Sequence, residues 1–367
     1  MEKVKISNYQ LYTLMVLFGL GSSSVLGLGK EAMQDAWISI IIGCCFGVII
    51  FLLYGMIIKN YPDYSIIEIL NKTFGSKLGK IIGFIYIIYF AFYTSVVLRD
   101  IFELLSLYVM TETPIFVLAL VSIIVFAYAT FLGIETIVRF GVLIFVISIP
   151  LKLLFILGTI ASGITALENL LPVLENGLRP VIGASFPLIT GIPFGQMFIF
   201  LMVLPYVKEK EKTVKTSIYA IITTGIILLL ITIENIITLG PLFIDLSVFP
   251  TIQTIRLVNI MNFFQRLEGL AVVVFLTCGF MKGIVYLYSV TIGINMLFNT
   301  KNYKFYLIIV LPVILLCSLL YTENLSTHLD LRSSIYLQLI NVALEILLPL
   351  IIIFIIYIKQ LKKNKLN

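Results

Sequence analysis

Long runs of apolar residues alternate with short polar segments along the whole chain. A helix needs about 20 mostly apolar residues to cross a bilayer, whereas a transmembrane strand shows alternating apolar and polar positions. The runs here are continuous, so they predict transmembrane helices with short connections and no inserted soluble domain. Ten runs have this character: residues 11–28, 36–58, 81–108, 115–132, 142–162, 181–205, 217–239, 270–297, 304–322 and 335–358.

The composition agrees with this pattern. Of the 367 residues, 60% are hydrophobic and 12% are charged, whereas soluble domains carry about 25% charged residues. These values exclude a water-soluble fold, a fibrous repeat, a disordered chain and a disulfide scaffold. The four cysteines lie in apolar runs and count as small hydrophobic residues. A single histidine, His328, cannot build a metal site alone, and we expect no cofactor.

Basic residues alternate from loop to loop. If both termini are cytoplasmic, 17 of the 25 basic residues lie on the inner side, six lie on the outer side and two lie within the spans. Cytoplasmic loops carry such an excess, so the net charge of +6 is a topology signal and indicates no nucleic-acid partner. The inner set is Lys3, Lys5, Lys59, Lys72, Lys77, Lys80, Arg139, Lys208, Lys210, Lys212, Lys215, Lys301, Lys304, Lys359, Lys362, Lys363 and Lys365.

Two of the ten runs contain helix-breaking residues at membrane depth. The first run carries GLGSSSVLGLG at residues 19–29, and the sixth carries FPLITGIPFGQ at 186–196. Backbone groups inside a bilayer must pair within a helix unless they face protein or a water-filled cavity. Both runs therefore predict helices that unwind within the membrane.

The positions of these breaks favour a binding site. Ten spans divide into two halves of five with opposite orientation, and interrupted helices at matching places in two halves indicate a midplane site. The ends of the half-helices would expose N–H groups suited to a carboxylate. The alternative is that glycines and serines serve helix packing, as they commonly do in membranes.

Charged residues within the spans are costly and indicate function or a structural ion pair. Lys152, Lys282 and Glu345 lie in the middle of spans 5, 8 and 10, and Glu234 lies in the outer part of span 7. Either lysine could be neutral or could pair with Glu345. Glu234 lies close to the predicted outer surface, so a structural role is the favoured interpretation for it.

Two helical faces add hydroxyl groups near these charges. Tyr86, Tyr89 and Tyr93 share one face of span 3, and Lys282, Tyr286 and Ser289 share one face of span 8. These faces either line a cavity or pack between helices. The chain contains no HExxH, GxSxG or phosphate-loop motif, so we expect no enzyme.

Eight short sequence features occur along the chain in an order typical of one protein family. They are Gln10 before the break at Gly21, DAW at 35–37, GSKLGKIIG at 75–83, Arg99, TPI at 113–115, GIETIVR at 133–139, NLLPVLENG at 169–177 and QRLEG at 265–269. Their order and spacing resemble the B subunits of bacterial spore germinant receptors, the endospore germination permease family. That family belongs to the amino acid–polyamine–organocation transporter superfamily.

The resemblance implies an all-α integral membrane fold. Ten transmembrane helices would form a LeuT-like 5+5 inverted repeat in which helices 1 and 6 are discontinuous. A single membrane domain would hold repeat one at about 9–165 and repeat two at about 178–358, followed by a basic cytoplasmic tail at 359–367.

The resemblance also implies that spans 3 and 8 complete a pocket at the breaks in spans 1 and 6. The expected ligand-binding residues are Gly21, Ser22, Ser23, Ser24, Tyr89, Tyr93, Phe194, Gly195, Lys282 and Tyr286. Lys152 is the candidate for ion or proton coupling, since some proton-coupled members of the superfamily carry a lysine in span 5.

The leading hypothesis for function is a germinant sensor in the inner membrane of the spore. It would bind a small nutrient, with an amino acid as the leading candidate, and would act with the A and C subunits of the receptor. The first alternative is a proton-coupled amino acid permease that acts alone, and the second is a scaffold bundle without a ligand.

Overall fold

The computed structural model describes residues 5–259, 267–300 and 302–364. Several residues used in the charge and motif arguments have side chains outside this described part: Lys3, Gln265, Arg266, Lys301, Lys363 and Lys365.

Within the described part, nine helical segments are long and apolar enough to cross a membrane. They are Lys30–Asn60, Ser76–Tyr108, Ile115–Leu132, Ile134–Ala161, Leu178–Met202, Lys210–Leu239, Glu268–Leu297, Tyr303–Leu320 and Ile335–Lys362. They match nine of the ten predicted runs. The first predicted run contains the helix α1 (Asn8–Leu20), whose 13 residues extend only about 20 Å, less than the hydrocarbon core of about 30 Å.

The long helices are separated by shorter helical segments. The elements are α1, η1 (Ser22–Ser24), η2 (Lys30–Asp35), α2 (Ala36–Asn60), α3 (Ile66–Phe74), α4 (Ser76–Tyr108), α5 (Ile115–Leu132), α6 (Ile134–Ala161), η3 (Leu167–Leu170), α7 (Leu178–Gly183), η4 (Ala184–Phe194), η5 (Gly195–Met202), η6 (Leu204–Tyr206), α8 (Lys210–Leu239), α9 (Pro241–Leu246), α10 (Pro250–Arg256), α11 (Glu268–Leu297), α12 (Tyr303–Leu320), α13 (Leu325–Ser333), α14 (Ile335–Asn341), η7 (Val342–Leu347) and α15 (Leu348–Asn364).

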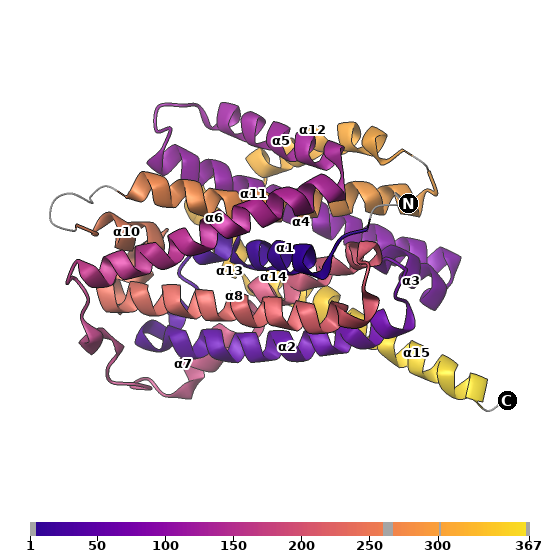
Figure 1. Cartoon of the computed structure of the whole chain (residues 1–367), viewed down its shortest axis with the longest axis horizontal. Coiled ribbons are helices and arrows are strands. Elements are labelled where there is room, and N and C mark those ends of the chain that lie inside the picture. The colour runs from indigo at the N-terminus through magenta and orange to yellow at the C-terminus, as the bar shows by residue number, and fades with distance from the viewer. Residues whose placement is uncertain (1–4, 260–266, 301, 365–367) are drawn as a thin grey trace.

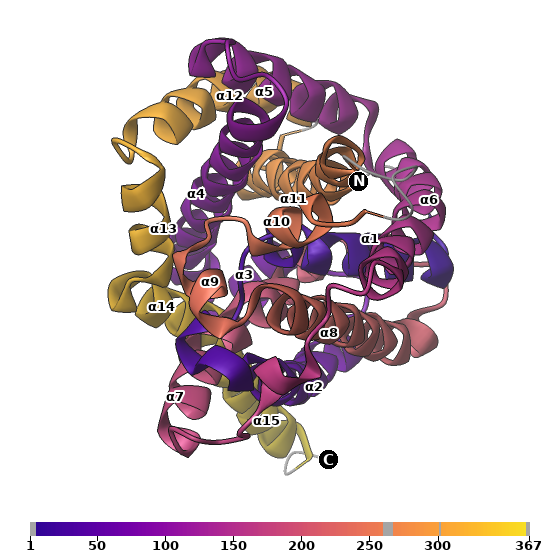
Figure 2. The same cartoon turned by 90° about the vertical axis from the view of Figure 1, so that its left-hand side faces the viewer.

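The short helix α1 lies inside the bundle, where it packs on α6, α8 and α11 (Figures 1 and 2). The longest helix pairing is between α4 and α11. Large apolar side chains on the outer helices are exposed, for example Phe116, Leu157 and Ile308. Since the chain is a membrane protein, this apolar outer surface faces lipid.

Two of the short sequence motifs are joined by hydrogen bonds between loops. Both carboxylate oxygens of Asp35, from the DAW motif, accept the backbone N–H of Leu174 at 3.0 and 3.1 Å. Gln34 donates to the backbone oxygen of Pro172 and to Glu175. The motifs at 35–37 and 169–177 therefore bind each other at one end of the bundle.

The arginine late in span 3 also has a structural role. Arg99 is buried, forms an ion pair with Glu103 at 2.9 Å and donates to the backbone carbonyl group of Ser318 in the last turn of α12 and to that of Thr322 just after it. A cation at the C-terminal end of a helix satisfies free carbonyl groups and complements the helix dipole. Arg99 thus joins α4 to the end of α12.

Two motif glycines adopt conformations that favour glycine. Gly75 and Gly133 have φ of 83° and 88°, and they immediately precede α4 and α6. A side chain at positive φ is strained, so these glycines allow the sharp turns that start two membrane-spanning helices.

Candidate ligand-binding site

The first run is broken where the sequence predicts. Gly21 has φ of 13° and ψ of −129°, which ends α1 after Leu20, and a short 3₁₀ turn at Ser22–Ser24 follows. Ser23 is buried, and its hydroxyl oxygen has no hydrogen-bond partner. The break therefore places buried backbone and hydroxyl groups in the interior of the bundle.

The sixth run is interrupted twice. Phe186 and Ile192 have extended conformations, and each precedes a proline. The proline ring clashes with a helical conformation of the residue before it, which explains both positions. The π-helical segment η4 contains both residues, and η5 after it is a 3₁₀-helix.

The tyrosine face of span 3 contacts span 10. Tyr89 Oη lies 2.5 Å from Glu345 Oε1 and 3.1 Å from Asn341 Oδ1, and Tyr93 donates to Asn341 Oδ1 at 2.8 Å. All four side chains are buried. The predicted face thus forms a polar cluster in the protein interior.

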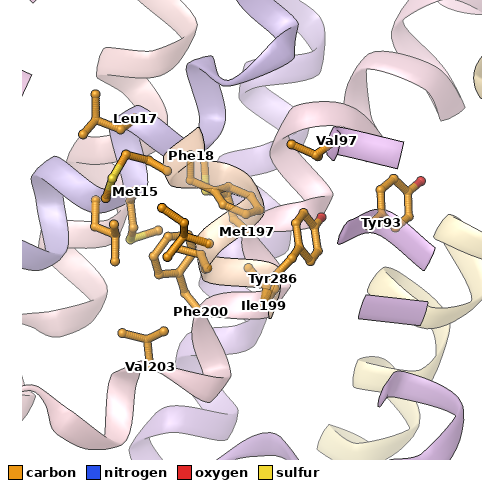
Figure 3. Close-up of a cluster of buried hydrophobic side chains, with 14 of the residues drawn as sticks. Met15, Leu17, Phe18, Tyr93, Val97, Met197, Ile199, Phe200, Val203 and Tyr286 are labelled. Carbon is orange, nitrogen blue, oxygen red and sulfur yellow. The ribbon is translucent and has the colours of Figure 1, made fainter. Parts of the chain in front are cut away.

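The predicted face of span 8 meets the same tyrosines. The rings of Tyr93 and Tyr286 stack with centroids 5.6 Å apart, and Phe18 lies 5.2 Å from Tyr286. Figure 3 shows Phe18, Tyr286 and Tyr93 side by side within a group of apolar side chains. The hydroxyl of Tyr286 has no hydrogen-bond partner, so it is available to a ligand.

Lys282 lies against the break in span 1. It is 1% exposed, and its Cδ would be 2.6 Å from a Cβ atom at Gly21. Its Nζ lies 5.3 Å from the centre of the Phe18 ring. Gly21 therefore makes room for the stem of a buried lysine.

Span 10 contributes residues that the sequence analysis missed. Its segment η7 is a π-helix, and tyrosines from spans 2 and 3 bind its carbonyl groups: Tyr54 donates to Glu345 O at 2.5 Å and Tyr86 to Leu344 O at 2.6 Å. Asn341 and Glu345 are four residues apart on one helical face. Two polar residues at this spacing within a membrane-spanning run would have indicated Asn341 as a further candidate for the site.

Glu345 forms no ion pair within 4.0 Å with either candidate lysine. The pairing that the sequence left open is therefore not formed. Lys152 is buried, and its Nζ has no hydrogen-bond partner and lies 3.4 Å from the centre of the Phe275 ring.

The remaining predicted residues lie around these groups. Gly195 packs against Glu345, because a Cβ there would be 2.3 Å from Glu345 Oε2. Phe194 instead packs on Gly47 of α2 and Gly225 of α8. Ser289 donates to its own helix and Ser24 to Gly21 O. The structure thus brings Gly21, Lys282 and Tyr286 together at one side and Tyr89, Tyr93 and Gly195 at the other.

A buried polar network lies next to the break in span 1. His328 Nε2 lies 2.7 Å from Asp100 Oδ1, Arg332 pairs with Asp100 Oδ2, and Tyr321 bonds His328 Nδ1. Burial raises the pKa of Tyr321 above its ordinary value, so its hydroxyl stays protonated. An ionised Asp100 carboxylate can only accept hydrogen bonds, so in its bond with that carboxylate His328 donates from Nε2.

Two cavities border this network. A cavity of about 160 Å³ is lined by Arg332, Ile192 and the segment after the break, among others. A second cavity of about 20 Å³, with room for about one water molecule, is lined by Gly21, Ser22 and Asp100. Arg332 also lies 3.5 Å from the Ser22 hydroxyl. The Arg332–Asp100 pair therefore contributes one residue to the lining of each cavity.

The contact between Gly195 and Glu345 gives a prediction. Gly195→Ala is expected to destabilise the protein by about 1–3 kcal/mol, because the new methyl group must displace a buried carboxylate. Gly183→Ala is the matched control, since a Cβ at Gly183 meets nothing within 4 Å. Thermal unfolding in detergent measures both, and equal melting temperatures for the two variants would contradict the contact.

Comparisons with known proteins bear on this arrangement. A family model described as "Spore germination protein" matches residues 5–326. Spore germination protein KB of Bacillus subtilis (strain 168) is 32% identical over 365 residues, which cover 100% of this chain and 98% of that protein. Spore germination protein A2 of the same organism is 27% identical over 335 residues, which cover 90% of this chain and 88% of that protein.

Solved transporter structures share the fold. Mhp1, a nucleobase-cation-symport-1 family transporter, in a closed conformation with bromovinylhydantoin matches with a TM-score of 0.66 and 14% identity, over 90% of this chain and 75% of that chain. MhsT in complex with L-phenylalanine matches with a TM-score of 0.65 and 13% identity, over 96% of this chain and 99% of that chain. At these identities the likeness establishes the fold alone.

Proposed function

Because the chain belongs to the spore germination protein family, we propose that it is the membrane subunit of a germinant receptor that binds a small nutrient between its broken helices. The family and the transporter-like fold make it a non-enzymatic membrane protein. The observation that carries the proposal is the meeting of Lys282 with the break at Gly21, beside the stacked Tyr93 and Tyr286.

We further propose the complete ten-span arrangement, a 5+5 inverted repeat in the inner membrane of the spore with both termini in the cytoplasm. In Figure 1, α1 begins and α15 ends toward the same end of the bundle, which supports an even number of crossings. The broken first segment would be the tenth span, paired with the break in the sixth.

The nutrient is proposed to be an amino acid. Its carboxylate would bind the backbone N–H groups at the break in span 1 together with Lys282, and its side chain would meet the aromatic rings. Binding would favour one arrangement of the two repeats by no more than the difference in affinity between arrangements. The A and C subunits would respond to that change.

A permease remains a second candidate, because the solved relatives in fold include transporters that bind small molecules. In that function Lys152, a buried lysine without a hydrogen-bond partner, would couple transport to protons. Uptake of amino acids by the purified protein in vesicles, saturable and dependent on a proton gradient, would favour the permease over the sensor.

The proposal predicts that Gly21→Trp abolishes the nutrient response at normal protein level, because an indole at this position displaces Lys282 from the break. Germination of dormant spores across a panel of amino acids, hexoses and nucleosides measures the response. Lys282→Ala and Tyr93→Leu are expected to change the order of preference among nutrients. An unaltered response of Gly21→Trp spores would instead support a scaffold without a ligand.

A further inference from the structure

Glu345 is a buried carboxyl group with one oxygen that forms no hydrogen bond. It is 1% exposed. One oxygen, Oε1, accepts from Tyr89 at 2.5 Å, whereas Oε2 has no hydrogen-bond partner. A buried polar group is costly to leave without a hydrogen bond, and here one acceptor oxygen is unused.

The unused oxygen points at the break in span 6. Oε2 is the nearest atom to a Cβ built at Gly195, at 2.3 Å, and it lies 3.7 Å from one built at Gly191. Glycines at these two positions leave the backbone of the broken helix within reach of the carboxylate. The unpartnered Oε2 therefore faces the region where span 6 unwinds.

The neighbouring groups supply more acceptors. Gln196 follows Gly195, is buried, and its Oε1 has no partner. Asn341 Oδ1 already accepts the hydroxyl groups of Tyr89 and Tyr93. Among the described residues, no lysine, arginine or histidine nitrogen lies within 4.0 Å of the Glu345 carboxylate. The region thus holds a buried carboxyl group and free acceptor oxygens, and a group rich in N–H donors would complete it.

A cation without an anion lies on the other side of the stacked tyrosines. Lys282 is buried and forms no ion pair within 4.0 Å among the described residues. It is four residues from Tyr286 on α11, Tyr286 stacks on Tyr93, and Tyr93 bonds Asn341, which is four residues from Glu345. The two opposite charges therefore flank one pair of aromatic rings.

We propose that Glu345 binds the ammonium group of a zwitterionic amino acid whose carboxylate lies at Lys282 and the break in span 1. This assignment rests on the proposed nutrient site and adds its amine-binding half. A zwitterion brings one charge of each sign, so it pairs both buried groups and leaves the net charge of the site unchanged. The cavity at Gly21 has room for about one water molecule, so binding of an amino acid requires the surrounding side chains to move.

The test uses the full-length protein in lipid nanodiscs and a calorimetric binding panel of amino acids, hexoses and nucleosides. For the tightest amino acid, the corresponding carboxylic acid without the amine is the matched probe; for L-alanine this is propionate. Glu345→Gln is expected to weaken binding of the amino acid by about 30-fold or more, since one partner of a buried charge pair is removed. It is expected to change binding of the deaminated acid by less than about threefold.

The control variant is Glu234→Gln. Glu234 is also a buried carboxylate in a span, but it is bonded to Thr159 at 2.6 Å, and we expect the same affinities as wild type. Glu345→Asp retains the charge and is expected to recover part of the affinity. The melting temperature of each variant without ligand measures folding, so a general loss of structure is recognised by equal weakening of both probes.

Each outcome decides between the two proposals. Selective loss of amine-bearing ligands in Glu345→Gln supports the inference. Equal affinities of wild type and Glu345→Gln for the amino acid, or equal losses for both probes, would overturn the inference alone. Binding of only hexoses or nucleosides by wild type would overturn the amine site but leave a nutrient site standing. No binding of any panel member would overturn the proposed function and the inference with it.

Discussion

Asp100→Ala is expected to destabilise the protein by about 3–5 kcal/mol, the usual cost of removing one partner from a buried ion pair. The substitution leaves the Arg332 guanidinium, whose side chain is 11% exposed, without its anion. It also removes the acceptor of His328, which is fully buried. Reversible unfolding in detergent with a chemical denaturant measures the change.

Two controls distinguish the cost of breaking a buried ion pair from the cost of removing any charged side chain. Glu135→Ala breaks a pair with Arg139 whose side chains are 46% and 70% exposed, and such pairs contribute at most about 1 kcal/mol. The double variant Asp100→Leu/Arg332→Met is expected to regain most of the lost stability, because an apolar replacement leaves no unpaired charge. A loss in Asp100→Ala as small as that of Glu135→Ala would contradict the buried network.

Gly283→Ala is the second substitution with a large expected effect. A Cβ at this position would lie 2.0 Å from Cζ and 2.2 Å from Cε2 of Phe126, a fully buried ring that also packs edge-on against Phe280. Forcing one extra carbon into a filled core typically costs about 1–3 kcal/mol. We expect a cost at the upper end, because α11 must move away from α5 or the ring must leave its place.

The same helix offers the control. Gly269→Ala adds a Cβ that meets nothing within 4 Å, and alanine is the better helix former by about 0.5–1 kcal/mol, so no loss is expected. Phe126→Leu in the Gly283→Ala background is expected to recover part of the stability through a non-additive coupling. The melting temperatures of wild type, Gly283→Ala, Phe126→Leu and the double variant test this coupling. If the effects of the two substitutions simply add, the direct contact is refuted.

The sequence predicted the features that depend on local pattern. Nine of the ten apolar runs became helices long enough to cross a membrane, because such a run has no other way to pair its backbone in lipid. Gly21 and the prolines at 187 and 193 interrupt their segments as expected, since the helix-breaking effect of these residue types acts within one turn.

Features that depend on packing between distant segments were not predictable. His328 was considered only as a metal ligand, yet it bonds Asp100, which lies 228 positions earlier. Phe194 was predicted as a ligand-binding residue, and the sequence did not reveal that its ring fills the space left by Gly47 and Gly225. The π-helix in span 10 was also missed, because an apolar run does not reveal which carbonyl groups will receive tyrosines from other helices.

The interior position of α1 has a consequence for synthesis. Its partners α6, α8 and α11 begin 126 or more residues after it does, since α6 starts at Ile134 and α1 at Asn8. The 13 residues of α1 are shorter than the hydrocarbon core is thick, and the helices on which α1 packs are all translated after it. We therefore expect α1 to reach its buried position only after α11 has been made.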